Sequence, residues 1–306
     1  MGTVPFLFCR YMMQIGEEVL DHSGTYGLLS DRQGQFFARG ATAEAEGIRT
    51  LVVMRPRQLT IGDEDVVVWA MGHRPGHRTT TDYDSAAQEI KYRVQSDTHI
   101  LHTEVIAIPR LGAMAVMDRS SALHAAARPS LNRIRAFFRQ IDDGAFTYTF
   151  LAPGDLTQVL DELTLKEYSY TVRRINPTPP SALAEAMHNS LVAEGIAVSR
   201  GVAVPAPGEE MVRGEGPIGA TSDLAAAGYG VIGAKGLTSN GRLAQIRKPK
   251  FSMDKKENLE QQEKEQPLRV FFDDAEQGDD LIASVVGELV RFYGGDDAPD
   301  VPEVAA

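Results

Sequence analysis

Residues 168–175, Tyr-Ser-Tyr-Thr-Val-Arg-Arg-Ile, decide the fold class of this chain. Aromatic or apolar side chains at every second position alternate with polar ones, which predicts a β-strand that buries one face. The buried set is Tyr168, Tyr170 and Val172, and the polar set is Ser169, Thr171 and Arg173. A candidate strand at 145–151 and a candidate helix at 155–163 precede this strand, so we predict a compact β-α-β unit.

The part of the chain before this unit consists mainly of short apolar runs bounded by Gly or Pro, which predict strands. These runs occupy residues 4–8, 48–54, 66–71 and 99–109. Residues 111–117 are expected to pair with the last run as a hairpin through Pro109 and Arg110. We therefore predict an α+β fold with a mixed, mostly antiparallel sheet core, a β-α-β unit and flanking helices.

Three segments, 129–141, 181–195 and 279–292, have the period of amphipathic helices. Ser181 can cap the second of them, because its hydroxyl can accept a hydrogen bond from a backbone N–H of the first turn. A hairpin is expected between the second and third helices, with its turn at Ser239-Asn240-Gly241, because Asn-Gly suits a tight turn with positive φ.

The composition divides the chain into five consecutive regions. We expect a β-rich region at 1–127, a helix plus β-α-β-α region at 128–198, and a Gly/Pro-rich loop at 199–222. A hairpin, a charged linker and a strand–helix pair follow at 223–293, and residues 294–306 are expected to be a disordered acidic tail.

The net charge of the 306 residues is −11, which argues against a protein that binds nucleic acid with its whole surface. Residues 107–252 are the exception, with 16 basic and 13 acidic side chains, whereas 253–306 carry 5 and 15. The single cysteine, Cys9, excludes an intrachain disulfide. Because no run of about 18 apolar residues occurs, we expect a cytoplasmic protein that does not contact membranes.

The helix predicted from Pro129 has a basic side. Arg128, Arg135 and Arg139 fall close together on a helical wheel, and Arg173 and Arg174 lie nearby in sequence, in the strand predicted at 168–175. Guanidinium groups pair well with phosphate oxygens, so this stripe is a candidate surface for nucleic acid or for a protein partner. The alternative is a structural role, in which this solvated helix face pairs with the acidic C-terminal part of the chain or with another subunit.

Glu89 and Lys91 form a Glu-x-Lys pair of the kind that metal-dependent nucleases use on one strand face. A divalent cation would then need a further carboxylate, from Asp65, Asp82 or Asp84. An ordinary ionic surface is the competing interpretation. Outside this alternative the sequence predicts no cofactor and no metal site.

Two further patterns stay open. The glycine spacing between Gly228 and Gly233 matches that of dinucleotide sites, but it follows an alanine-rich stretch instead of a strand. The four histidines that lie nearest together in sequence are His73, His77, His99 and His102. In an extended strand, residues three apart point to opposite faces, so His99 and His102 are poorly spaced to chelate one metal.

Residues 168–177, which end in Asn-Pro, with the helix from Ser181 after them, resemble a strand, break and helix of an uncharacterised bacterial family associated with phage-defence loci. The basic helix and strand before them are similar too, so the resemblance spans about residues 130–195. It implies a bacterial antiviral defence component and supplies no catalytic residue.

We therefore expect a binding or regulatory protein that contacts nucleic acid or a protein partner through its arginine-bearing helix. One alternative is a divalent-metal-dependent nuclease, and a second is an assembly protein that forms a homo-oligomer. The sequence leaves open whether the protein is an enzyme.

Overall fold

The computed structural model describes residues 2–38, 50–74, 76–84, 89–97, 100–118, 127–151, 153–174, 181–214, 216–248 and 267–294. They form an α+β fold with an antiparallel sheet core. The chain divides into two compact units. Unit 1 comprises the described residues of Met1–Tyr11, Leu111–Ala115 and Tyr148–Ala306, and unit 2 those of Met12–Arg110 and Val116–Thr147.

These units do not follow the five consecutive regions expected from composition. The first residues of the chain and 111–115 belong with the C-terminal half, and the expected boundary at 127/128 falls inside unit 2. The physical reason is strand pairing: β1 (Thr3–Ile15) pairs with β15 (Leu268–Asp273), so the two ends of the described chain share one sheet. Composition along the chain carries no signal of such long-range pairing.

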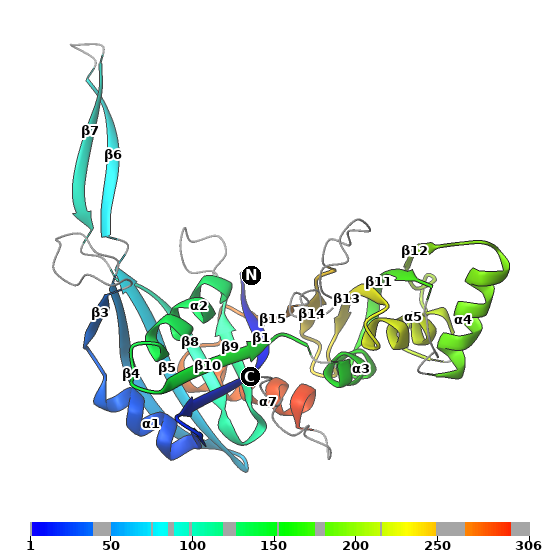
Figure 1. Cartoon of the computed structure of the whole chain (residues 1–306), viewed down its shortest axis with the longest axis horizontal. Coiled ribbons are helices and arrows are strands. Elements are labelled where there is room, and N and C mark those ends of the chain that lie inside the picture. Colours follow the sequence, from blue (N-terminus) through cyan, green and yellow to red (C-terminus); the bar gives the residue numbers. More distant parts are fainter. Residues whose placement is uncertain are drawn as a thin grey trace. The chain divides into compact units, whose positions relative to one another are not determined.

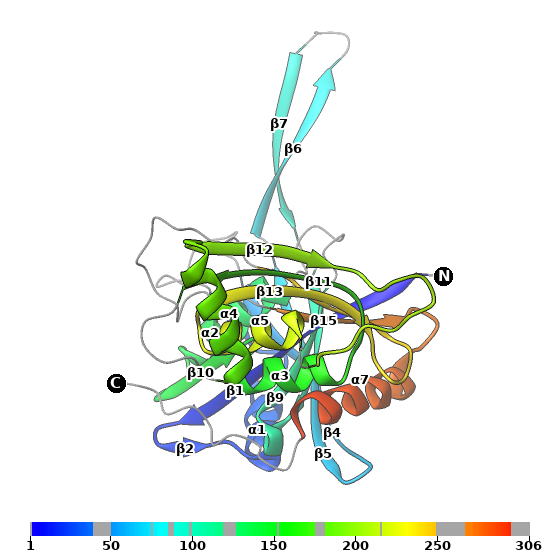
Figure 2. The same ribbon diagram turned by 90° about the vertical axis from the view of Figure 1, so that its right-hand side faces the viewer.

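Unit 1 is a sheet with helices on one face. Its strands follow the order β12-β11-β13-β14-β15-β1, and each neighbouring pair is antiparallel. The strands are β11 (Thr164–Arg173), β12 (Val198–Ala203), β13 (Gly230–Leu237), β14 (Leu243–Ile246), β15 and the first part of β1. The helices are α3 (Pro153–Asp161), α4 (Ala182–Ala193), α5 (Pro217–Ala226) and α7 (Gly278–Tyr293). Figure 2 shows α3, α4 and α5 together on one side of β12, β11 and β13.

The core of unit 1 lies between this sheet and its helices. Val172 of β11 packs with Ala184 and Leu191 of α4 and with Leu224 of α5. Further along the sheet, the ring of Phe8 contacts those of Phe272 and Phe292, with centroid distances of 6.5 and 6.2 Å. Cross-strand neighbours that are buried on one side therefore form a continuous apolar layer, which is the largest favourable contribution to folding.

Unit 2 contains a second part of the sheet, with β3, β4, β5 and β8 as successive neighbours (Figure 1). Its elements are β2 (Glu18–Val19), α1 (His22–Asp31), β3 (Phe36–Ala38), β4 (Thr50–Ile61), β5 (Glu64–Arg74), β6 (Gly76–Asp84), β7 (Glu89–Asp97), β8 (Leu101–Ile108) and α2 (Ala127–Phe138). Strands β6 and β7 form a separate two-stranded ribbon. Strands β1, β9 (Ala113–Met117) and β10 (Gly144–Thr149) contribute residues to both units.

The predictions that rest on local chemistry are confirmed. Strands β8 and β9 are neighbours joined through a 3-10 turn at Pro109–Leu111. The Asn-Gly turn joins β13 to β14, with φ +75 at Gly241, a conformation that glycine adopts without steric cost. Ser181 caps α4, because its Oγ accepts a hydrogen bond of 3.2 Å from the backbone N of Ala184.

The predicted β-α-β unit is not confirmed. The order β10, α3, β11 occurs along the chain, but β10 pairs with β1, whereas β11 lies between β12 and β13. The alternation of residues 168–173 identifies a strand and its buried face, but it does not identify the neighbouring strand. Sequence adjacency was therefore a wrong guide to pairing here.

The prediction of a loop at 199–222 is wrong for both ends of this range. Residues 198–203 form β12, and Gly201 belongs there because a Cβ at this position would lie 2.6 Å from ring atoms of Tyr170. Residues 217–226 form α5, in which Pro217 occupies the first helical position, where its missing N–H costs no hydrogen bond. Gly and Pro thus serve packing and helix initiation here. The charged run within 254–266 and the tail 295–306 lie outside the described residues.

Candidate functional site

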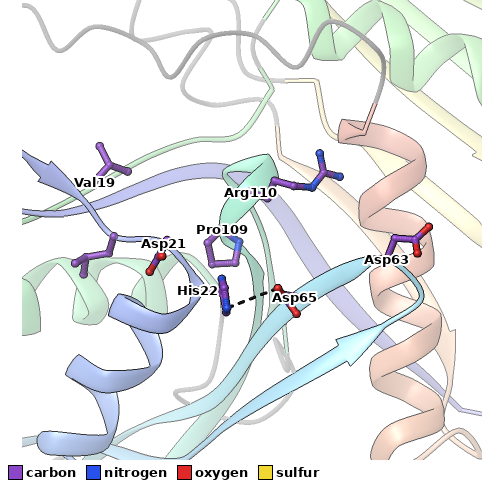
Figure 3. Close-up of a pocket in the computed structure, with 8 residues that line it drawn as sticks. Val19, Asp21, His22, Asp63, Asp65, Pro109 and Arg110 are labelled. Atoms are coloured by element: carbon purple, nitrogen blue, oxygen red, sulfur yellow. Dashed lines mark ion pairs between the residues drawn. The ribbon is translucent and has the colours of Figure 1, made fainter.

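A pocket of about 410 Å³ lies in unit 2 beside the beginning of α1 (Figure 3). Its walls come from β2, α1, the turn between β4 and β5, and the turn after β8. The lining residues are Val19, Leu20, Asp21, His22, Asp63, Asp65, Pro109 and Arg110. Of these residues, the sequence indicated Asp65 alone as a candidate site residue, and Pro109 and Arg110 as part of a turn. No motif joins them, because they come from turns far apart in sequence, although Asp21 before α1 is a recognisable N-cap signal.

His22 and Asp65 face each other in this pocket, with 3.6 Å between His22 Nε2 and Asp65 Oδ2. Asp65 also accepts a hydrogen bond of 3.1 Å from the Thr60 hydroxyl. The Ser23 hydroxyl lies 3.1 Å from the same nitrogen of His22. A serine–histidine–aspartate triad needs the two partners on different ring nitrogens, so this arrangement is not a nucleophilic triad.

An ion pair between a lining residue, Arg110, and the buried Glu64 lies at the wall of the pocket. Arg110 donates two hydrogen bonds to Glu64, one of them from Nε to Oε2 at 3.1 Å. The Glu64 side chain is 8% exposed and that of Arg110 is 65% exposed, so the guanidinium reaches solvent while its partner does not. The hydrogen bond to Glu64 raises the pKa of Arg110, which therefore stays cationic. Arg110 is thus held in place by Glu64.

The pocket does not assemble a metal centre. Among the residues whose side chains the structure describes, no group of three or more His, Cys, Asp or Glu is placed to hold a metal ion. The Asp21 carboxylate, moreover, accepts the Gly24 N–H at 2.7 Å as the cap of α1. The pocket thus combines separate polar groups and has no converging ligand set.

The structure does not bring the three proposed nuclease residues together. Asp65 lies near the first residue of β5, beside His22, whereas the ribbon that carries Glu89 and Lys91 follows the opposite end of β5. The separation reflects strand length, because the ten residues from Asp65 to Arg74 extend about 30 Å. The side chains of Glu89 and Lys91 lie outside the described part.

The backbone of the ribbon nevertheless has the predicted form. Residues 89–97 are a strand, and the register places Asp84 opposite Glu89 and Asp82 opposite Lys91. Residues directly opposite each other in an antiparallel pair are close neighbours. The carboxylates that the ribbon can offer to a Glu-x-Lys pair are therefore Asp82 and Asp84 rather than Asp65.

The arginine-bearing helix is α2. Its apolar stripe is fully buried, with no exposed surface on Leu131, Ile134, Phe137 or Phe138. Arg135 is half-buried and Arg139 exposed, and the backbone N of Arg139 donates to the carbonyl of Arg135 at 3.1 Å. These two arginines therefore follow each other by one helical turn. The side chain of Arg128 lies outside the described part.

Arg173 and Arg174 belong to unit 1 and not to the unit that contains α2. The Arg174 guanidinium donates to the carbonyl oxygens of Ile196, at 2.6 Å, and Leu191, at 3.1 Å. This pattern ties β11 to the end of α4, which is a structural role. Arg173 is half-buried on the side of β11 away from the helices. The five arginines do not form one patch within either unit.

The glycine spacing from Gly228 to Gly233 serves strand packing. A Cβ at Gly230 would lie 2.7 Å from the carbonyl oxygen of Thr171, and one at Gly233 would lie 2.9 Å from Cβ of Lys248. The spacing follows helix α5 and enters strand β13, the reverse of the order in a dinucleotide site. Close packing explains these two glycines without a nucleotide.

The structure describes the side chain of one of the four histidines, His102. His102 is half-buried in β8, and the register pairs it with Gly72 rather than with another histidine. His73 pairs in register with Leu101. The side chains of His73 and His77 lie outside the described part, as does His99.

No family model matches the chain, and no curated protein matches it. Within the described residues, none of the helices is long and apolar enough to cross a membrane.

Proposed function

We propose that this chain is a nucleic-acid-binding protein that acts by binding, with the exposed side of α2 as a contact surface. The observation that supports the proposal is that α2 has two sides. Its apolar stripe has no exposed surface, whereas Arg135, and Arg139 one turn later and directly after the end of α2, lie outside that stripe. The resemblance of residues 130–195 to a phage-defence family supports a role in cytoplasmic bacterial antiviral defence.

The chemistry of this surface suits phosphate. A guanidinium presents a planar fork of donors that matches phosphate oxygens, and it keeps its charge at any physiological pH. Residues four apart on a helix are neighbours, so Arg135 and Arg139 can contact adjacent phosphates of one strand. Contacts of this kind position a protein on nucleic acid and carry no sequence information.

The test is a binding titration with Arg135→Glu/Arg139→Glu. Fluorescence anisotropy with labelled DNA and RNA at low salt should show at least about a tenfold loss of affinity, because both phosphate contacts become repulsive. The matched control is Arg55→Glu/Arg57→Glu, which reverses two exposed arginines of β4 in the same unit. Equal affinities of wild type and the α2 variant would refute the proposed surface.

A metal-dependent nuclease is the second candidate, and the register of the β6–β7 ribbon favours it, because it pairs position 84 with position 89 and position 82 with position 91. Cleavage of labelled DNA and RNA should then require Mg²⁺ or Mn²⁺, and Glu89→Gln should lose cleavage but keep binding. Glu18→Gln, an exposed glutamate of β2, is the matched control. Absence of metal-dependent cleavage by wild type would eliminate this candidate.

One measurement, made before the binding titrations, distinguishes the assembly alternative from the proposed function. Size-exclusion chromatography with light scattering and the ratio of absorbance at 260 and 280 nm reports mass and bound nucleic acid together. A discrete oligomer that carries no nucleic acid and binds none would favour assembly over the proposed function.

A further inference from the structure

In the sheet of unit 1, four strands (β12, β11, β13 and β15) carry a basic residue on the face that the helices do not cover, and the residue directly after a fifth, β14, is also basic and on this face. In β11 the helix side is defined by Tyr168, whose hydroxyl bonds to Thr221 of α5, and by Val172, which packs on α4. Neighbouring residues of a strand point to opposite faces, so Arg173 belongs to the other face. The registers extend this assignment to the neighbouring strands.

On the edge strand β12, Arg200 lies opposite Thr171, two residues from Arg173, and so shares its face. On β13, Lys235 lies opposite Glu167, which is on the same face. Gln245 of β14 lies opposite both Lys235 and Arg269 of β15. Arg247, two residues beyond Gln245, continues the ladder with a backbone hydrogen bond of 3.3 Å to Pro267.

The burial pattern agrees with this assignment. In β14 and β15 the alternate residues Ala244, Ile246, Leu268, Val270 and Phe272 are buried on the helix side. The basic residues of the opposite face reach solvent: Arg200, Lys235 and Arg247 are exposed, and Arg173 and Arg269 are half-buried. We call these five residues the basic sheet face. Lys248, the next residue along the chain, lies against Gly233 on the same face.

Acidic residues are few on the basic sheet face. Two acidic residues occupy described positions of β11–β15 on this face. Glu167 accepts a hydrogen bond of 3.0 Å from Lys235, and Asp273 lies at the end of β15. The helices on the opposite side have the reverse composition. Within α3, α4, α5 and α7 there are seven acidic residues and one arginine, Arg291. Charge is therefore segregated between the two layers of unit 1.

We infer that the basic sheet face binds the phosphodiester backbone of nucleic acid. Strands about 4.8 Å apart spread the five cations over about 19 Å from β12 to β15, a length that covers several phosphates of one strand. Between them lie Ser169 on β11, which is half-buried, and Gly233 on β13, which is buried against Lys248. The inference rests on the proposed function for the class of ligand, but the surface belongs to the other unit.

The first experiment compares full-length wild type with Arg173→Gln/Arg200→Gln/Arg247→Gln. Anisotropy titrations use single-stranded DNA, single-stranded RNA and duplex DNA of about 20 nucleotides. These probes show which kind of nucleic acid supplies the phosphodiester backbone that binds. At about 100 mM salt the variant should bind at least about tenfold more weakly. Between about 50 and 200 mM salt, the slope of log K against log salt for single strands should become shallower by about 2, because three contacts are lost.

The matched control places the same change of net charge on the helix layer. Ala182→Glu/Ala186→Glu/Asn189→Asp alters three exposed positions of α4 and should keep wild-type affinity and slope. Circular dichroism and the thermal transition verify that each variant is folded. If the triple Gln variant does not fold, Arg200→Glu/Arg247→Glu at two exposed positions replaces it, with the same expected loss.

Three outcomes overturn the inference: unchanged affinity of the sheet variant, an equal loss in the α4 control, or binding to phosphatidylglycerol vesicles with no binding to any oligonucleotide. The α2 variant separates the two proposals. A loss in the α2 variant alone refutes the basic sheet face and leaves the proposed function standing. A loss in the sheet variant alone refutes α2 as the contact surface and supports the basic sheet face.

Discussion

Arg10 of β1 and Asp155 of α3 form a buried ion pair, in which Nη2 and Nε of the guanidinium donate to Oδ1 at 2.8 and 3.1 Å. Only 11% of the Arg10 side chain and 2% of the Asp155 side chain are exposed. Nη1 donates to the carbonyl of Leu111 at 2.6 Å, and the guanidinium carbon stands 4.7 Å from the ring centroid of Tyr293. The pair thus connects β1, α3 and α7 inside unit 1.

Removal of one partner should be costly. Asp155→Asn leaves the Arg10 charge buried without its counterion, and we expect the free energy of unfolding to fall by about 3–5 kcal/mol. The double variant Arg10→Met/Asp155→Leu removes both charges and should recover most of that loss, because apolar groups of similar volume replace the pair. Urea unfolding of the three proteins measures both effects. A double variant no more stable than Asp155→Asn would contradict this account.

Glu276 should make stability depend on pH in the acid range. Its two carboxylate oxygens accept from Arg242 at 2.8 and 3.2 Å, and these hydrogen bonds lower the pKa of Glu276 below its ordinary value. Because the pKa of Glu276 is lower in the folded state, its ionised form stabilises the fold at any pH above the unfolded pKa of about 4.3. This contribution to stability is lost as the pH falls through the pKa of the folded state.

Glu276→Gln should therefore be less stable than wild type by about 1 kcal/mol at pH 7. The difference between the two proteins should shrink as the pH falls below about 4.3, because protonation removes the same charge from wild type. Urea unfolding at a series of pH values measures it. A gap that stays constant down to pH 3 would show that Glu276 does not titrate with folding.

Ser181 should stabilise α4 through its cap. Its hydroxyl accepts from the backbone N of Ala184 and donates to Asp223 Oδ2 at 2.6 Å, so Ser181→Ala loses both hydrogen bonds. We expect a loss of about 1–2 kcal/mol in the free energy of unfolding. Ser181→Thr keeps a hydroxyl at the same position and should recover most of it. Equal stability of the Ala and Thr variants would mean that the cap contributes nothing.

Cys9 should be unreactive in the native protein. The side chain has no exposed surface, and burial raises the pKa of its thiol well above the ordinary value. The thiolate is the reactive form, so Ellman's reagent at pH 8 should label the native protein only as fast as it opens. One thiol per chain should react at once in concentrated guanidinium chloride. Rapid labelling under native conditions would contradict the burial of Cys9.

Local chemistry made part of the fold predictable. Ser181 begins a helix because its own side chain satisfies a backbone donor. Gly241 turns the chain because it lacks a Cβ. The alternation at 168–173 needs only the pleat of a strand. Each of these signals acts within a few residues, and the structure confirms each of them.

Long-range pairing was not predictable in this way. Strand β11 pairs with β12 and β13, whose positions follow from packing across the whole unit, so the β-α-β expectation was not confirmed. The basic sheet face could not be predicted in full for the same reason. Arg173 was identified, but its neighbours on the sheet, Arg200 and Arg269, were not. They stand up to 96 residues away in sequence, and only the strand register brings them to one face.

The separation of charge between the layers of unit 1 also has a kinetic consequence. The helix layer holds more carboxylates than the arginines that pair with them, while the sheet layer holds more cations than carboxylates. The described charges of unit 1 therefore give a dipole component normal to the sheet, with its positive end on the sheet layer. A polyanion that diffuses nearby exerts a torque on this dipole and turns the sheet layer toward itself before any contact forms. Such orientation raises the association rate constant and makes that rate fall as ionic strength increases.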